Sequence, residues 1–210
     1  EWMKGIVPLK DIAAAAATSI PMTDAQRMPL CRVFGYTRED IQEILLPMAK
    51  NGTEPIVSMG ADEPLAVLSK VHPPLFSYFR QRFAQVTNPP IDAIREKIKT
   101  DQSVYIGDDG NLLKPCGENC KVIELPTPIL TSEELERIRN IRHPAFRVAT
   151  LSILYPKTNN LQSALDQLFA DCDSACRNGA NIVILSDRGI DRDRLAIPSL
   201  LAVSALEQSN

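Results

Sequence analysis

The chain has 210 residues, of which 44% are hydrophobic and 23% are charged, and its formal net charge is −3. This composition is typical of a soluble globular protein. The acidic balance excludes most nucleic-acid binders, because neutralising a phosphate backbone needs a surplus of basic side chains. The longest apolar runs, 12–17 and 182–185, are too short to span a bilayer, so we expect no membrane association. The expected location is the cytoplasm, or the plastid stroma in a photosynthetic eukaryote.

The first part of the chain predicts short helices joined by turns. Thr23 opens a helical pattern, and Thr37 followed by Asp40 is typical of a capped helix that ends at Asn51–Gly52. An extended piece then leads into the loop 58–62, which precedes a further short helix. These patterns indicate a mainly helical first lobe.

The middle of the chain predicts a change from helices to strands. The spacing of apolar residues indicates a buried helix over 75–83 and another over 91–99. A glycine turn between 104–106 and 111–113 predicts a β-hairpin, and 122–125 is expected to be extended. We therefore expect a small β excursion in this region.

The last third predicts a β-α-β-α unit that follows a short capped helix over 131–141, in which Ser132 or Thr131 stands ahead of Glu134 as the cap. Its elements are a strand, a helix, a strand and a helix over residues 146–154, 161–177, 182–185 and 197–206. The fold class expected is α/β, with a mostly parallel sheet, flanking helices, partial barrel-like or Rossmann-like layering and a small β-hairpin. We expect one domain over 1–210, with candidate lobes at 1–99, mainly helical, and 100–210, α/β.

The sequence carries no motif that predicts a catalytic centre. Phosphate-binding, dinucleotide-binding and nucleophile-elbow patterns are missing. Its two histidines, His72 and His143, each precede a proline and lie in no cluster suited to metal binding or to a catalytic triad. We therefore expect no catalytic residue in this chain.

Four of the five cysteines form two pairs with the same spacing, Cys116 with Cys120 and Cys172 with Cys176. Four thiolates would suit a structural zinc ion. The spacing also puts Cys172 on the apolar stripe of the predicted helix 161–177, where a thiol serves as a small hydrophobic side chain. The second interpretation is favoured, so no metal ligand is predicted.

Three segments have both a functional and a structural interpretation. The loop 58–62 offers backbone N–H groups that suit an anion, or it is an ordinary capped turn. Asp187 and Arg188 follow a predicted parallel strand at its carboxyl end, where such sheets place their sites, or they form a structural ion pair. The polar residues Thr87 and Asn88 stand before two prolines, in a rigid turn that either lines a site or joins two helices.

Several segments closely resemble the central domain of the glutamate synthase large subunit. The string Thr-Asn-Pro-Pro-Ile-Asp at 87–92 is the most specific of them. The others are 35–48, 58–69, 79–86, 185–188 and 197–205. The resemblance covers nearly the whole chain and is weakest over about 99–143. The opening Glu1-Trp2-Met3, with no methionine at the first position, is what a segment of a longer chain would show.

The resemblance implies a role in making two glutamates from glutamine and 2-oxoglutarate. In that family an amidotransferase domain releases ammonia, and a domain with flavin mononucleotide (FMN) and an iron–sulfur cluster uses it. The central domain joins the two and an ammonia tunnel runs along it, so this chain is expected to carry no cofactor and to be inactive alone. The resemblance implies that these residues line the tunnel or the 2-oxoglutarate pocket: Ser58, Met59, Gly60, Ala61, Asp62, Thr87 and Asn88.

A stand-alone α/β module is the alternative to a linking domain. Such a module would bind a small anion through its loops or a structural zinc ion through its cysteines. The electron donor of the parent enzyme, whether NADPH, NADH or ferredoxin, lies outside what this segment encodes.

Overall fold

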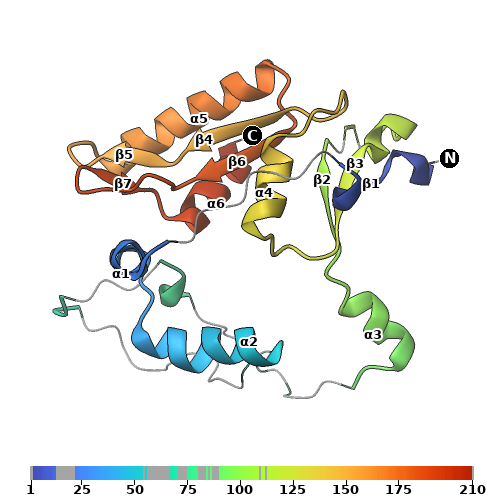
Figure 1. Cartoon of the computed structure of the whole chain (residues 1–210). Coiled ribbons are helices and arrows are strands. Elements are labelled where there is room, and N and C mark those ends of the chain that lie inside the picture. The colour runs from blue at the N-terminus through green and yellow to red at the C-terminus, as the bar shows by residue number, and fades with distance from the viewer. Residues whose placement is uncertain are drawn as a thin grey trace. The chain divides into compact units, whose positions relative to one another are not determined.

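Figure 1 shows the computed structural model of the chain. The structure describes residues 2–12, 22–53, 55, 67–70, 75–79, 84, 86, 90–108, 110, 111 and 113–209. The chain forms two compact units, one made of residues 1–19 with 86–210 and the other of residues 20–85. Each unit is described by itself.

The unit of residues 20–85 contains two capped helical segments. Helix α1 (Asp24–Val33) starts after Thr23, whose backbone N–H donates to the Gln26 side chain at 3.0 Å. The second segment starts after Thr37 and continues through a π-helical stretch (Asp40–Leu45) into α2 (Leu46–Asn51). It ends at Gly52, whose φ of 63° gives the left-handed cap predicted from Asn51–Gly52.

The π-helical stretch lies directly before Pro47. Its last N–H, from Leu46, donates to the carbonyl of Ile41, five residues earlier. Pro47 has no N–H to donate to the carbonyl four residues earlier, and its ring crowds the preceding turn. A widened turn just before the proline is therefore the expected adjustment. The buried helix predicted over 75–83 is only partly within the described residues: Leu75–Tyr78 is a 3-10 turn, and Phe79 is 67% exposed.

The larger unit opens with a short strand that the sequence did not indicate, β1 (Val7–Pro8), between two 3-10 turns. β1 pairs in parallel with β3 (Val122–Leu125), and β3 pairs in antiparallel with β2 (Val104–Gly107). The predicted hairpin was therefore wrong in its partner as far as the described residues show, because β2 pairs with β3, and Asn111 and Leu113 belong to no strand. The three apolar side chains of β3 are almost fully buried, whereas Leu113 is 92% exposed, so apolar burial favours the longer-range pairing.

Two helices frame this region of the chain. Helix α3 (Ala93–Lys99) is capped by Asp92, whose carboxylate accepts from the N–H groups of Ile94 and Arg95 at 3.0 and 2.9 Å. Helix α4 (Ser132–Arg139) is capped by Thr131, one of the two residues that the capping pattern allowed. Both predicted helices are therefore confirmed.

The last third is confirmed as β-α-β-α. Strand β4 (Val148–Ser152) and strand β6 (Ile182–Ser186) pair in parallel, and helix α5 (Leu161–Arg177) connects them. Helix α6 (Ser199–Ser209) follows. Between these elements, β5 (Leu154–Pro156) and β7 (Arg194–Ala196) form an antiparallel ribbon.

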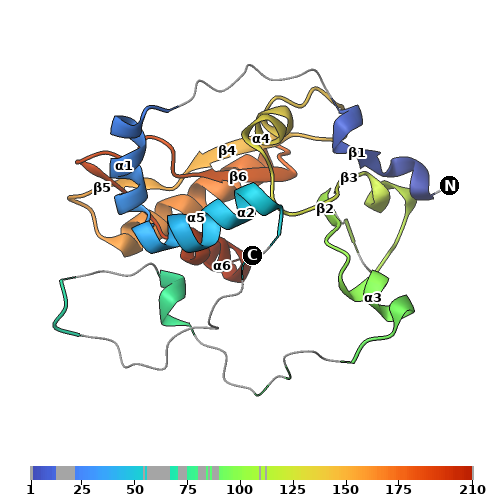
Figure 2. The same cartoon turned by 60° about the horizontal axis from the view of Figure 1, so that its bottom comes forward.

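Helices cover both faces of the β4–β6 pair, as the continuous apolar run of β6 predicted. One core gathers Ile182 and Phe146 with Ile138 of α4 and with residues of β3. The other gathers Leu168 of α5 with Ala202 of α6 against the opposite face of the strands. Figure 2 shows α4 on one side of the strand pair and α5 and α6 on the other.

The fold class is mixed α/β, as predicted, with six α-helices and three small sheets among the described residues. The mostly parallel sheet with Rossmann-like layering is not seen there, because two of the four strand pairs are antiparallel. These sheets hold three, two and two strands, and none of them closes into a barrel within the described part of the chain. None of the described helices combines the length and apolar character that crossing a bilayer requires.

Candidate functional site

The residues predicted to line a tunnel or substrate pocket lie outside the described part of the chain. This holds for Ser58, Met59, Gly60, Ala61 and Asp62, and equally for Thr87 and Asn88. Their predicted role stays a prediction.

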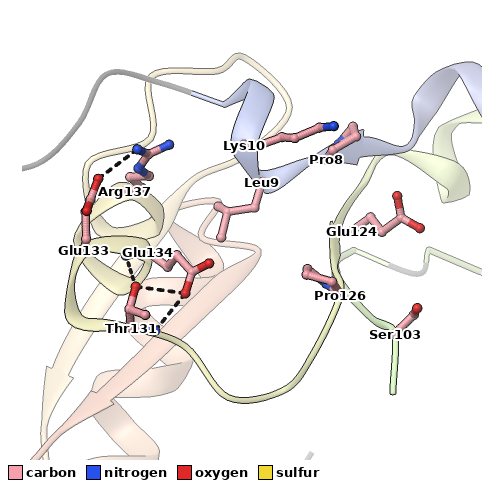
Figure 3. Close-up of a pocket in the computed structure, with 10 residues that line it drawn as sticks. All are labelled: Pro8, Leu9, Lys10, Ser103, Glu124, Pro126, Thr131, Glu133, Glu134 and Arg137. Atoms are coloured by element: carbon pink, nitrogen blue, oxygen red, sulfur yellow. Dashed lines mark hydrogen bonds and ion pairs between the residues drawn. The ribbon is translucent and has the colours of Figure 1, made fainter. Parts of the chain in front are cut away.

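A cleft of about 620 Å³ lies in the larger unit, between the three-stranded sheet and helix α4 (Figure 3). This volume suits a small organic molecule. Leu9 and Lys10 bound it on one side, α4 on the second, and the end of β3 on the third. Its lining residues are Pro8, Leu9, Lys10, Ser103, Glu124, Pro126, Thr131, Glu133, Glu134 and Arg137.

The carboxylate of Glu134 is held by the first turn of α4. Its Oε2 accepts from the N–H of Thr131 at 2.8 Å and from the Thr131 hydroxyl at 2.9 Å, while the Glu134 N–H donates back to that hydroxyl at 3.2 Å. The N–H of Thr131 and then its hydroxyl lower the pKa of Glu134, so this carboxylate is ionised near neutral pH.

The remaining charges of the cleft are mixed. Arg137 donates to Glu133 at 2.8 Å, and Glu124 accepts from the hydroxyl of Tyr105 at 3.3 Å. Lys10 is exposed and forms no ion pair with a described residue. The lining includes no histidine or cysteine, so the cleft has the character of a polar binding surface rather than of a nucleophile–base pair.

The carboxyl end of the parallel pair is covered by the chain itself. Strand β4 runs through the buried Ile153 into β5, and β6 leads through a loop into β7. The N–H of Ile153 donates to the carbonyl of Ser186 at 3.0 Å, and the N–H of Lys157 donates to the carbonyl of Asp193 at 2.8 Å. The β5–β7 ribbon therefore occupies the position at which open parallel sheets bind ligands.

Arg188, in the loop after β6, is part of an ion-pair network with α4. It donates to Glu136 at 3.2 Å, and Arg139 donates to the same carboxylate oxygen. The structural interpretation of Asp187–Arg188 was thus right about an ion pair and wrong about its partner, because Arg188 pairs with Glu136. A helix residue 52 positions away gives no local signal of such a partner.

The two cysteine pairs do not assemble into one site. Among the described residues no group of three or more histidine, cysteine or acidic side chains is placed to hold a metal ion. Cys172 is buried on the apolar face of α5, as its place in the helical stripe predicted. Burial, followed by the neighbouring Cys176, raises the pKa of Cys172, so its thiol stays protonated.

Most of the cleft was not predicted from the sequence. The sequence indicated a cap ahead of Glu134, from Thr131 or Ser132, and gave no link between that cap and Lys10 or Glu124. The cleft depends on the pairing of β1 with β3, which brings residues 7 and 8 beside residues 123 and 124. Two-residue strands leave no periodicity in a sequence, so this juxtaposition could not be predicted from spacing.

Comparison with known proteins assigns the chain to a family. Residues 30–209 match the model of the glutamate synthase central domain. The chain belongs to the glutamate synthase family. The glutamate synthase [NADPH] large chain of Bacillus subtilis is 44% identical over 177 residues, which are 84% of this chain and 12% of that protein.

Two further relatives match the same region. The ferredoxin-dependent glutamate synthase 2 of Synechocystis is 42% identical over 214 residues, covering 98% of this chain and 13% of that protein. The glutamate synthase [NADH] of Schizosaccharomyces pombe is 39% identical over 192 residues, covering 89% and 9%. This glutamate synthase segment thus spans roughly a tenth of its relatives' length. Proteins named for three different electron donors share it, so it does not determine the donor.

Proposed function

We propose that this segment is the linking domain of a glutamate synthase large chain. In that role it joins a glutamine amidotransferase domain to an FMN-binding synthase domain and helps to enclose the path of ammonia. The match of residues 30–209 to the central domain of the family carries this proposal. The whole protein would then make glutamate from glutamine and 2-oxoglutarate.

The covered carboxyl end of the β4–β6 pair supports a linking role. In a parallel sheet this end is where an active site is normally built, and here the β5–β7 ribbon occupies it. On this proposal the FMN and the iron–sulfur cluster belong to other domains of the longer protein, as the resemblance to the family implies. The 210-residue segment acts, on this proposal, as a single domain without a catalytic centre.

We propose that the loops 58–62 and 87–88 line the ammonia path or the adjoining 2-oxoglutarate pocket. Backbone groups and small polar side chains suit a tunnel wall, because they can hydrogen-bond ammonia without trapping it as ammonium. Neither loop contains a histidine, a lysine or a cysteine. Their assignment rests on the resemblance of these two loops to the family.

The test of the tunnel uses the full-length enzyme with Thr87→Val and Asn88→Leu combined. The expected result is glutamine hydrolysis at nearly the original rate with less glutamate formed per glutamine and more ammonia released to the medium. The matched control is Thr158→Val with Asn159→Leu, a polar pair exposed in the loop before α5. Unchanged coupling in the Thr87–Asn88 variant would contradict the assignment of these two residues.

The isolated 210-residue chain is predicted to have no turnover. It should form no glutamate from glutamine, 2-oxoglutarate and a chemical reductant, because it would contain neither the amidotransferase nor the FMN domain. Glutamate production is measured by chromatography against a full-length enzyme as the positive control. Turnover by the pure segment would contradict the linking role and revive the alternative of a self-sufficient module.

A further inference from the structure

Among the described residues, β6 pairs with another strand along one of its two edges only. The N–H of Ile182 donates to the carbonyl of Arg147 at 3.2 Å, and the carbonyl of Ser186 accepts from Ile153 at 3.0 Å. In a strand the N–H and C=O of one residue point to the same side, and successive residues alternate. Val183 and Leu185 therefore direct their backbone groups away from β4.

Within the part of the chain that the structure describes, this outward edge has no partner, and its residues are apolar. Neither Val183 nor Leu185 has a backbone hydrogen bond on its outward side to any residue in the described part of the chain. Both side chains are only partly exposed, and Leu185 packs against the core that α5 and α6 form. Proteins normally protect a free edge with charges, prolines or a bulge. The run Ile182–Leu185 has none of these, which indicates an edge that is paired in the functional protein.

The arrangement of α5 and α6 determines which edge the next strand would reach. Both helices pack on the same face of the β4–β6 pair, opposite α4 (Figure 2). Crossovers between parallel strands are nearly always right-handed. Two successive right-handed crossovers whose helices lie on the same face place their strands in the same direction across the sheet. A strand that follows α6 therefore lies next to β6, on the side away from β4.

We propose that the outward edge of β6 binds a parallel strand supplied by the segment that directly follows residue 210 in the longer protein. The inference rests on the proposed function, and the relatives, of which this chain spans roughly a tenth, have ample chain to supply such a strand. The added strand lies between the two helical layers that already cover β6. It is therefore a run of about five apolar, mainly β-branched residues, with Val183 and Leu185 as its hydrogen-bond partners.

Residue-resolved amide hydrogen exchange tests the proposal in three proteins. They are the 210-residue chain, the same chain lengthened by about 20 residues of its own coding sequence, and the full-length enzyme. Ile184 is the internal reference, because its N–H faces β4 in all three. In the 210-residue chain Val183 and Leu185 should exchange at least about tenfold faster than Ile184. In the two longer proteins they should exchange as slowly as Ile184.

Three results would overturn the proposal. The first is fast exchange of Val183 and Leu185 in the full-length enzyme. The second is protection in the full-length enzyme alone, which would assign the edge to a distant domain. The third is protection already present in the 210-residue chain and lost on dilution, which would assign it to a second copy. A coding sequence with no glutamate synthase domains around this segment would instead refute the proposed function, and sequencing detects that outcome separately.

Discussion

Two residues at the start of α4 combine a helix cap with one wall of the cleft. Thr131 and Glu134 exchange three hydrogen bonds, and Glu134 lines the cleft beside Glu133. A reciprocal cap of this type stabilises a helix by about 1 kcal/mol. The sequence predicted this cap because the signal is local, and it could not reveal the cleft that the cap borders.

The lowered pKa of Glu134 makes its contribution to stability depend on pH. A carboxylate with a folded-state pKa below its unfolded value stabilises the protein at neutral pH. That stabilisation is lost as the pH falls from the ordinary glutamate pKa down through the folded one. Glu134→Gln keeps an acceptor for Thr131 and removes the titration.

Urea denaturation from pH 7 down to about pH 3 measures this effect as the stability difference between wild type and Glu134→Gln. The wild type should lose its advantage as the pH falls. Asp40 and Asp191, whose pKa values are also lowered by hydrogen bonds, titrate equally in both proteins and cancel in the difference. A difference that does not vary with pH would contradict the assigned role of the carboxylate.

The carboxylate of Glu136 accepts hydrogen bonds from two arginines, Arg139 and Arg188. Glu136→Ala should lower the free energy of unfolding by about 1–3 kcal/mol, because Arg139 would keep a mostly buried charge without its partner. Arg188→Ala should cost only about 0.5 kcal/mol, since its side chain is 58% exposed. Chemical denaturation measures both, with the exposed Arg192→Ala as a control expected to change little. Equal effects of all three substitutions would contradict the network.

At the scale of elements, α5 carries much of the core beside the parallel strands. Its apolar face was predicted from spacing, and the structure confirms Leu168 and Cys172 as buried. Leu168→Ala should reduce the free energy of unfolding by about 2–5 kcal/mol, because the side chain is only 2% exposed. Leu161→Ala in the same helix, at 37% exposure, is the matched control and should cost clearly less. The measurement is the midpoint of urea denaturation at pH 7.

Helices were easier to predict here than strand partners. The boundaries of α5 and the caps at Thr23, Thr37 and Thr131 follow from residues within one or two turns of each other. The pairing of β2 with β3 and of β5 with β7 joins segments separated by more than ten residues. The choice among such partners depends on which faces become buried, and a single sequence does not specify that.

At the scale of the whole molecule, the family is shown by comparison and the role within it is proposed. The resemblance noted in the sequence at 87–92, 185–188 and 197–205 lies within the matched region 30–209. The loops predicted to line the ammonia path lie outside the described residues, so their role depends on the coupling experiment. The mixed α/β class was predictable because the last third has the periodicity of alternating strands and helices.

The β5–β7 ribbon links two loops that would otherwise vary independently. Pro156 pairs with Arg194, and the bond from Lys157 to Asp193 closes the two connections against each other. A residue inserted after β4 would shift the register of β5 against β7 and turn side chains to the opposite face. Evolutionary changes in length should therefore be rare in both connections and should come as compensating pairs. The stretch 99–143, over which the resemblance to the family is weakest, is where relatives should differ most in length.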